Sequence, residues 1–80
     1  MSRKSQMRSS LQKGDLVWIP DKTYGFDELS YRHHIDGPVI GLAVGDANIH
    51  PDQESIEVVL GSRKLSFYKG DIYYFGDING

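Results

Sequence analysis

The sequence contains no cysteine, so neither a disulfide nor a thiolate-bound metal ion can stabilise the fold. No segment approaches the ~20 consecutive apolar residues that a membrane-spanning helix requires. The basic residues near the start are not followed by the apolar stretch of a secretory signal, so we expect no such signal. At 80 residues the chain is one domain with a thin core, because a chain of this size buries only about 60% of its unfolded surface. Its stability must come from apolar packing or from a partner.

Recognisable catalytic motifs are also missing. The sequence has no Gly-x-Ser-x-Gly, no cysteine nucleophile, no glycine-rich phosphate loop and no His-Glu-x-x-His. His33, His34 and Asp36, with His50 and Asp52 further along, are residue types that bind zinc or another divalent ion. However, adjacent side chains on an extended segment point to opposite sides, so His33 and His34 cannot both reach one ion. We therefore expect no enzyme activity, no cofactor and no metal site.

The charge is divided unevenly along the chain, although the net charge is only −2. Residues 1–13 carry a charge of +4 and no acidic side chain, whereas residues 14–80 carry a charge of −6. We predict a flexible basic arm over residues 1–12, a domain over 13–76 and a short tail over 77–80. Such an arm could contact phosphate, dock on an acidic surface or remain in solvent.

Five short segments rich in β-branched and aromatic residues predict an all-β domain, and at this length a small barrel, since closure removes exposed sheet edges. The segments are residues 16–19, 39–44, 56–60, 64–68 and 72–75. Alternation in the first segment favours Val17 and Ile19 as core residues. Leu16 and Trp18 would then face outward, where the arm or a partner could cover them. The Gly61-Ser62 pair predicts a two-residue hairpin turn of type II′.

Residues 21–36 have no clear period, so we expect a long loop there, with at most a short helix over 26–31. A long irregular segment in a small domain is often functional. Aromatic side chains in and near this loop supply a large contact area at low entropic cost, although several could instead complete the core. The candidate partner-binding residues are Trp18, Tyr24, Phe26, Tyr31, His34 and Tyr68.

Four segments carry a resemblance to a known family. They are Lys13-Gly14-Asp15-Leu16-Val17, Gly37-Pro38-Val39-Ile40-Gly41, Gly61-Ser62 and Tyr68-Lys69-Gly70-Asp71-Ile72. Over residues 13–75 the chain resembles the SH3-like small barrel, most of all the short accessory modules of tailed bacteriophages. The resemblance implies a five-stranded barrel in which the long first loop and the last turn form a groove. It also implies a structural or protein-interaction module that binds a host or virion protein, either in the cytoplasm of the host cell or on the virion. The sequence leaves the oligomeric state open.

A weaker similarity, to the KOW-type barrels of translation and transcription proteins, supports an alternative. In that case basic side chains would neutralise nucleic-acid phosphates while aromatic rings stack on bases. The residues concerned are Arg3, Lys4, Arg8, Lys13, Arg63 and Lys64. The acidic body and the sequence pI of about 5.8 disfavour this alternative, because nucleic-acid-binding domains are usually basic.

Overall fold

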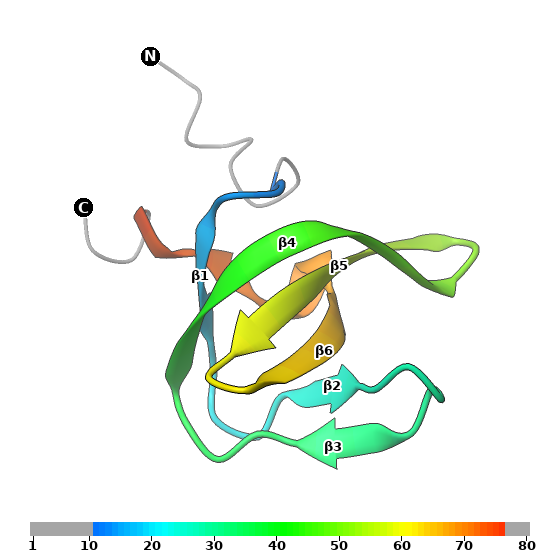
Figure 1. Cartoon of the computed structure of the whole chain (residues 1–80), viewed down its shortest axis with the longest axis horizontal. Coiled ribbons are helices and arrows are strands. Elements are labelled where there is room, and N and C mark those ends of the chain that lie inside the picture. The colour runs from blue at the N-terminus through cyan, green and yellow to red at the C-terminus, as the bar shows by residue number, and fades with distance from the viewer. Residues whose placement is uncertain (1–10, 77–80) are drawn as a thin grey trace.

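Seven strands form one antiparallel sheet in the computed structural model, which describes residues 11–76 (Figure 1). The strands are β1 (Leu16–Ile19), β2 (Tyr24–Phe26), β3 (Arg32–His34), β4 (Val39–His50), β5 (Gln53–Leu60), β6 (Arg63–Tyr68) and β7 (Tyr73–Tyr74). A 3₁₀ turn, η3 (Lys69–Asp71), connects β6 to β7. The strand order is β3-β2-β6-β5-β4-β1-β7.

The predicted all-β class is confirmed, and the five predicted strands correspond to β1, β4, β5, β6 and β7. The structure has seven strands instead of five, because the expected long loop folds into the β2–β3 hairpin. Each of these two strands has only three residues, too few for alternation to be visible in the sequence. The end strands β3 and β7 are not paired with each other in the described part of the chain, so the sheet curls without closing.

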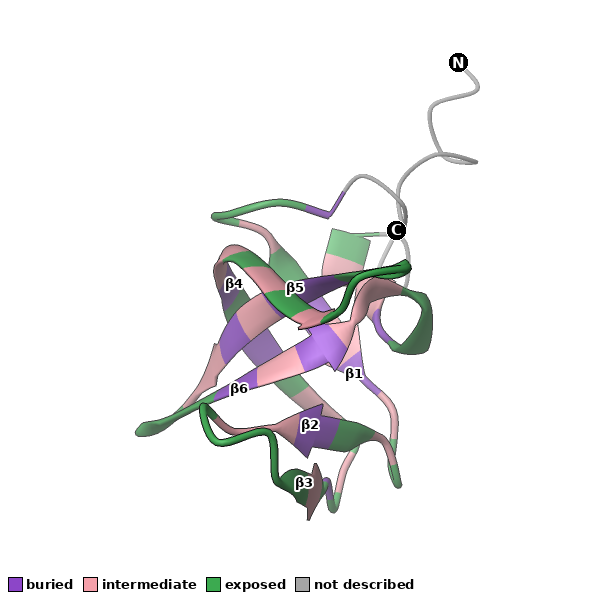
Figure 2. Ribbon diagram, turned by 90° about the vertical axis from the view of Figure 1, so that its right-hand side faces the viewer, coloured by how far each residue is buried: buried purple, intermediate pink, exposed green. Residues whose placement is uncertain are grey.

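Buried residues alternate with less buried ones along β1, β5 and β6 (Figure 2), and the buried hydrophobic side chains form one core. Its buried members are Leu11, Val17, Ile19, Ile35, Ala43, Ile56, Val58, Leu65, Phe67 and Ile72. Val17 and Ile19 are fully buried, as alternation predicted. Leu11, which the prediction assigned to the basic arm, also packs in this core. The rest of the predicted arm, residues 1–10, and the predicted tail lie outside the described residues.

The connection between β5 and β6 takes the form that the sequence predicted. The Gly61-Ser62 turn joins Leu60 directly to its partner Arg63. The φ angle is +64° at Gly61 and not positive at Ser62, as in a type II′ turn. At the last turn, Lys69 lies in η3 and places its Nζ 3.5 Å from Asp46 on β4.

Candidate functional site

The β2–β3 hairpin packs one face on the core and presents the other to solvent. Gly25, at the centre of β2, points inward, where a Cβ would come within 2.8 Å of a buried ring carbon. Its neighbours Tyr24 and Phe26 therefore point outward. On β3, His34 lies opposite Tyr24 and Arg32 lies opposite Phe26, so all four side chains share the outer face.

Ring contacts join these outward side chains into two groups on the same face of the hairpin. The ring centroids of Tyr24 and His34 are 5.7 Å apart. Phe26 meets Tyr68 of β6 edge to face, also at 5.7 Å. The guanidinium carbon of Arg32 lies 4.6 Å from the ring centroid of Tyr24, within the range of a cation–π interaction. We call Tyr24, Phe26, Arg32, His34 and Tyr68 the hairpin surface.

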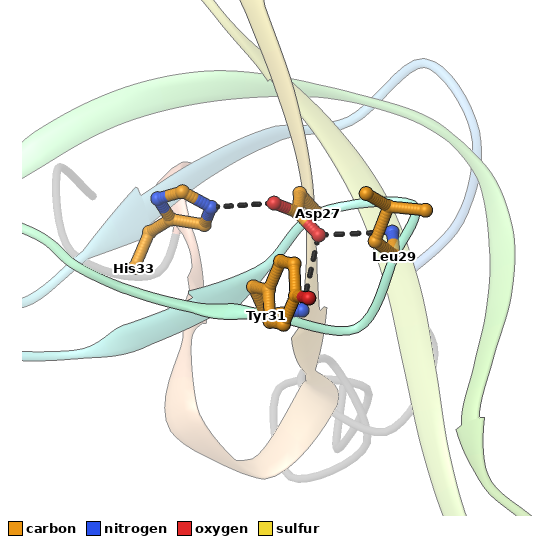
Figure 3. Close-up of polar contacts among 4 residues, drawn as sticks. All are labelled: Asp27, Leu29, Tyr31 and His33. Atoms are coloured by element: carbon orange, nitrogen blue, oxygen red, sulfur yellow. Dashed lines mark hydrogen bonds and ion pairs between the residues drawn. The ribbon is translucent and has the colours of Figure 1, made fainter.

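Asp27 fixes the turn at the end of this hairpin (Figure 3). Its Oδ1 accepts hydrogen bonds from the backbone amides of Leu29 at 2.9 Å and Tyr31 at 3.0 Å. Its Oδ2 accepts a third, from His33 Nε2 at 2.8 Å. The bond from His33 contributes most, followed by that from Tyr31, to holding the pKa of Asp27 below its usual value. The turn thus holds Leu29 and Tyr31 at its tip, where they are 70% and 66% exposed.

We expect Asp27→Ala to release this turn without unfolding the sheet. Amide hydrogen exchange at Leu29 and Tyr31, followed by NMR, should become several-fold faster, because each amide loses its acceptor. Glu28→Ala is the matched control, since Glu28 is exposed and makes no hydrogen bond or ion pair among the described residues. Equal exchange rates in Asp27→Ala and Glu28→Ala would contradict the conclusion that Asp27 holds the turn.

The lowered pKa of Asp27 also sets a pH dependence for the wild-type turn. A carboxylate whose pKa is lower in the folded state stabilises the fold above its unfolded pKa of about 3.9. The contribution is lost as the pH falls through the folded pKa. Exchange at Leu29 and Tyr31, corrected for intrinsic rates, should therefore show unchanged protection from pH 7 to pH 5 and lose it only in stronger acid.

Four of the six predicted partner-binding residues belong to the hairpin surface: Tyr24, Phe26, His34 and Tyr68. Tyr31 lies nearby at the tip of the turn. Trp18 lies elsewhere, on the outer face of β1, where its ring packs edge-on against Tyr73 of β7 at 5.9 Å. The contact between Phe26 and Tyr68 brings the first long segment beside the end of β6.

Three exposed residues that belong to surfaces of the folded domain were not predicted from the sequence. Arg32 belongs to the hairpin surface, but no pattern separated it from the other charged residues of its segment. Ile40 and Leu42 lie opposite Trp18 and Leu16 on the outer side of β1 and β4, and they are 50% and 42% exposed. The exposure of Ile40 and Leu42 could not be predicted, because the apolar run of residues 39–44 contains no alternation of apolar and polar residues.

The basic residues of the nucleic-acid alternative do not form one described patch. Lys13 precedes β1, whereas Arg63 and Lys64 begin β6. Lys64 lines a shallow cleft of about 270 Å³ together with the carboxylates of Asp27, Glu28 and Glu57. These carboxylates would repel a phosphate placed beside Lys64. The remaining candidates, Arg3, Lys4 and Arg8, lie outside the described residues.

The two adjacent histidines face opposite sides of β3, as alternation predicted. His33 is bonded to Asp27, whereas His34 packs against Tyr24, with its Nδ1 3.6 Å from Asp36. Between residues 11 and 76, no group of three or more His, Cys, Asp or Glu side chains is arranged to hold a metal ion.

Comparison with known proteins gives no relative for this chain. No protein-family model, curated protein or solved structure matches it. Within the part of the chain that the structure describes, no helix is long and apolar enough to cross a membrane. The function must therefore be inferred from the geometry of the site itself.

Proposed function

We propose that this chain is a non-enzymatic protein-interaction module of the SH3-like type that binds a partner protein through the hairpin surface. A structural accessory role in a bacteriophage follows from the sequence resemblance and is part of the proposal. The observation that carries the proposal is the exposure of aromatic side chains that contact their neighbours on a hairpin whose turn is closed by hydrogen bonds. Tyr24 is 44% exposed although its ring already contacts both His34 and Arg32.

The hairpin surface has the composition of a binding surface. Tyrosine, phenylalanine and arginine are enriched at protein interfaces. The aromatic side chains among them bury much area while few rotamers are lost. The exposed side chains of Leu29 and Tyr31 add further apolar area at the tip of the same hairpin. Such a patch in a folded domain is typical of an interaction site.

Two features of the structure make this surface rigid before binding. The core-facing Gly25 lets β2 lie directly on the core, and Asp27 holds the turn with three hydrogen bonds. A surface that is already ordered loses less conformational entropy on association than a mobile loop does. The hairpin can therefore bind a partner protein tightly enough for function even where the contact area is modest.

The proposal is tested by capture from a lysate of the organism that encodes the chain. Proteins retained by the immobilised wild-type chain should be lost with Tyr24→Ala and with Tyr31→Ala. For an aromatic residue at the centre of an interface we expect a loss of about 2 kcal/mol, or roughly thirtyfold in affinity. Circular dichroism should show that both variants remain folded.

Leu42→Ser is the control, because Leu42 is similarly exposed but lies on the outer side of β4. Retention by both tyrosine variants together with loss in Leu42→Ser would contradict the hairpin assignment and move the site to the outer side of β1 and β4. Treatment of the lysate with nuclease should leave the captured proteins unchanged. Their loss would favour the nucleic-acid alternative.

A further inference from the structure

Strand β3 ends the sheet and has a free edge within the described structure. In the β2–β3 hairpin, the Asp27 amide donates to the Tyr31 carbonyl at 3.0 Å, and the Ile35 amide donates to the Thr23 carbonyl at 2.9 Å. Hydrogen-bonded pairs alternate along an antiparallel ladder, so the pair between these two, Gly25 and His33, is also hydrogen-bonded.

The two remaining residues of β3, Arg32 and His34, are therefore the non-hydrogen-bonded positions of this ladder. Their amide and carbonyl groups point away from β2, toward the open side of the sheet. These outward-pointing groups recur at every second residue, which is the pattern that an added antiparallel or parallel strand would satisfy. The edge is short, but its backbone groups already have the geometry of a strand.

The side chains on this edge are basic in an otherwise acidic domain. Residues 11–76 contain ten Asp and Glu but only six Lys and Arg. Arg32 makes no ion pair within this described range and is held over the ring of Tyr24 instead. His34 lies beside it on the same face, and its neighbour Asp36 is almost wholly exposed.

Charge decides which kind of strand fits the edge. Exposed charged side chains on an edge strand discourage pairing between identical copies, because like charges meet. In an antiparallel pairing of two copies of this chain, Arg32 and His34 would face Arg32 and His34. A strand with carboxylates would instead gain an ion pair at Arg32, which has no carboxylate partner among the described residues.

We propose that β3 accepts an extended acidic segment of the partner protein as an additional strand. This inference rests on the proposed function and specifies how the partner binds. The amide and carbonyl groups of Arg32 and His34 pair with the partner backbone. A partner carboxylate meets the Arg32 guanidinium, which lies over the ring of Tyr24.

The test uses three synthetic peptides and NMR of the whole chain. The first alternates threonine and valine and carries glutamates at outward positions, and the second has lysines in place of the glutamates. The third repeats the acidic peptide but has N-methyl groups on the amides that would face β3. The acidic peptide should slow amide hydrogen exchange at Arg32 and His34 and leave Gly25 and His33 unchanged. The lysine and N-methyl peptides should bind much more weakly.

A charge exchange tests the role of Arg32 separately. Arg32→Glu should weaken binding of the acidic peptide by about fivefold or more and strengthen binding of the lysine peptide. Arg63→Glu is the matched control, because Arg63 is exposed at the β5–β6 turn and should leave both affinities unchanged. If Arg32→Glu and Arg63→Glu change the two peptide affinities alike, the proposed ion pair with Arg32 is contradicted.

The outcomes separate this inference from the proposed function. Failure of the acidic peptide to bind, or equal binding of the N-methyl peptide, would overturn strand addition. Binding without added protection at Arg32 and His34 would also overturn it, and protection that rises with protein concentration alone would point to a second copy. None of these results affects the lysate capture, which depends on Tyr24 and Tyr31 and tests the proposed function.

Discussion

Replacing Phe67 with alanine should remove most of the stability of this domain. Phe67 is completely buried at the centre of the core. Truncating a buried phenylalanine typically costs about 3–5 kcal/mol, because contacts are lost and the cavity collapses only partly. The single core of a domain this small rarely supplies more than about 3–5 kcal/mol, so little would remain. Urea denaturation followed by tryptophan fluorescence measures the change.

Phe67→Leu keeps the experiment informative if the alanine variant does not fold. It should lower the free energy of unfolding by less than Phe67→Ala while leaving the fold intact. Phe26→Ala provides a comparison at a partly exposed phenylalanine of the hairpin surface. If Phe67→Ala and Phe26→Ala lower the free energy of unfolding equally, the central position of Phe67 in the core is contradicted.

Gly25→Ala should also destabilise the domain, by about 1–3 kcal/mol. The added Cβ would lie 2.8 and 2.9 Å from two ring carbons of Phe67 and 3.1 Å from Leu65 Cδ1. Both neighbours are buried, so neither can move aside without disturbing the core. The hairpin should shift outward, and the melting temperature measured by calorimetry should fall.

Gly70→Ala is the matched control for this prediction, because nothing lies within 4 Å of a Cβ at Gly70. Equal melting temperatures for the two variants would show that β2 does not lie on Phe67. A second variant tests the contact directly. If the added Cβ clashes with the Phe67 ring, Gly25→Ala should destabilise the Phe67→Leu variant less than it destabilises the wild type. The losses of stability from the two substitutions will then not be additive.

The strands that the sequence predicted are those with several β-branched or aromatic residues in succession. The alternation of Val17 and Ile19 with Leu16 and Trp18 was enough to assign the buried side of β1. The β2–β3 hairpin was missed because its stability is not encoded in local propensity. It depends on Gly25 meeting Phe67, about forty residues later in the chain, and on a turn closed by Asp27.

The sequence predicted which residue types form the candidate site, but it did not predict how they are arranged in space. Aromatic composition pointed to Tyr24, Phe26 and Tyr68, but only the pairing of β2 with β6 brings Phe26 to Tyr68. The same composition pointed to Trp18, which the strand order places with Tyr73 instead. Long-range pairing of this kind has no signal in a single sequence.

Photo-crosslinking from the hairpin tip shows whether a partner protein binds at the hairpin surface. A benzophenone amino acid replaces Tyr31 in one variant and Asp52, in the β4–β5 turn, in another, and each is irradiated in the lysate. We expect a discrete crosslinked protein from position 31 that disappears when Tyr24→Ala is added, and no such product from position 52. The same product from both positions, or a product from position 31 that persists with Tyr24→Ala, would contradict binding through the hairpin surface.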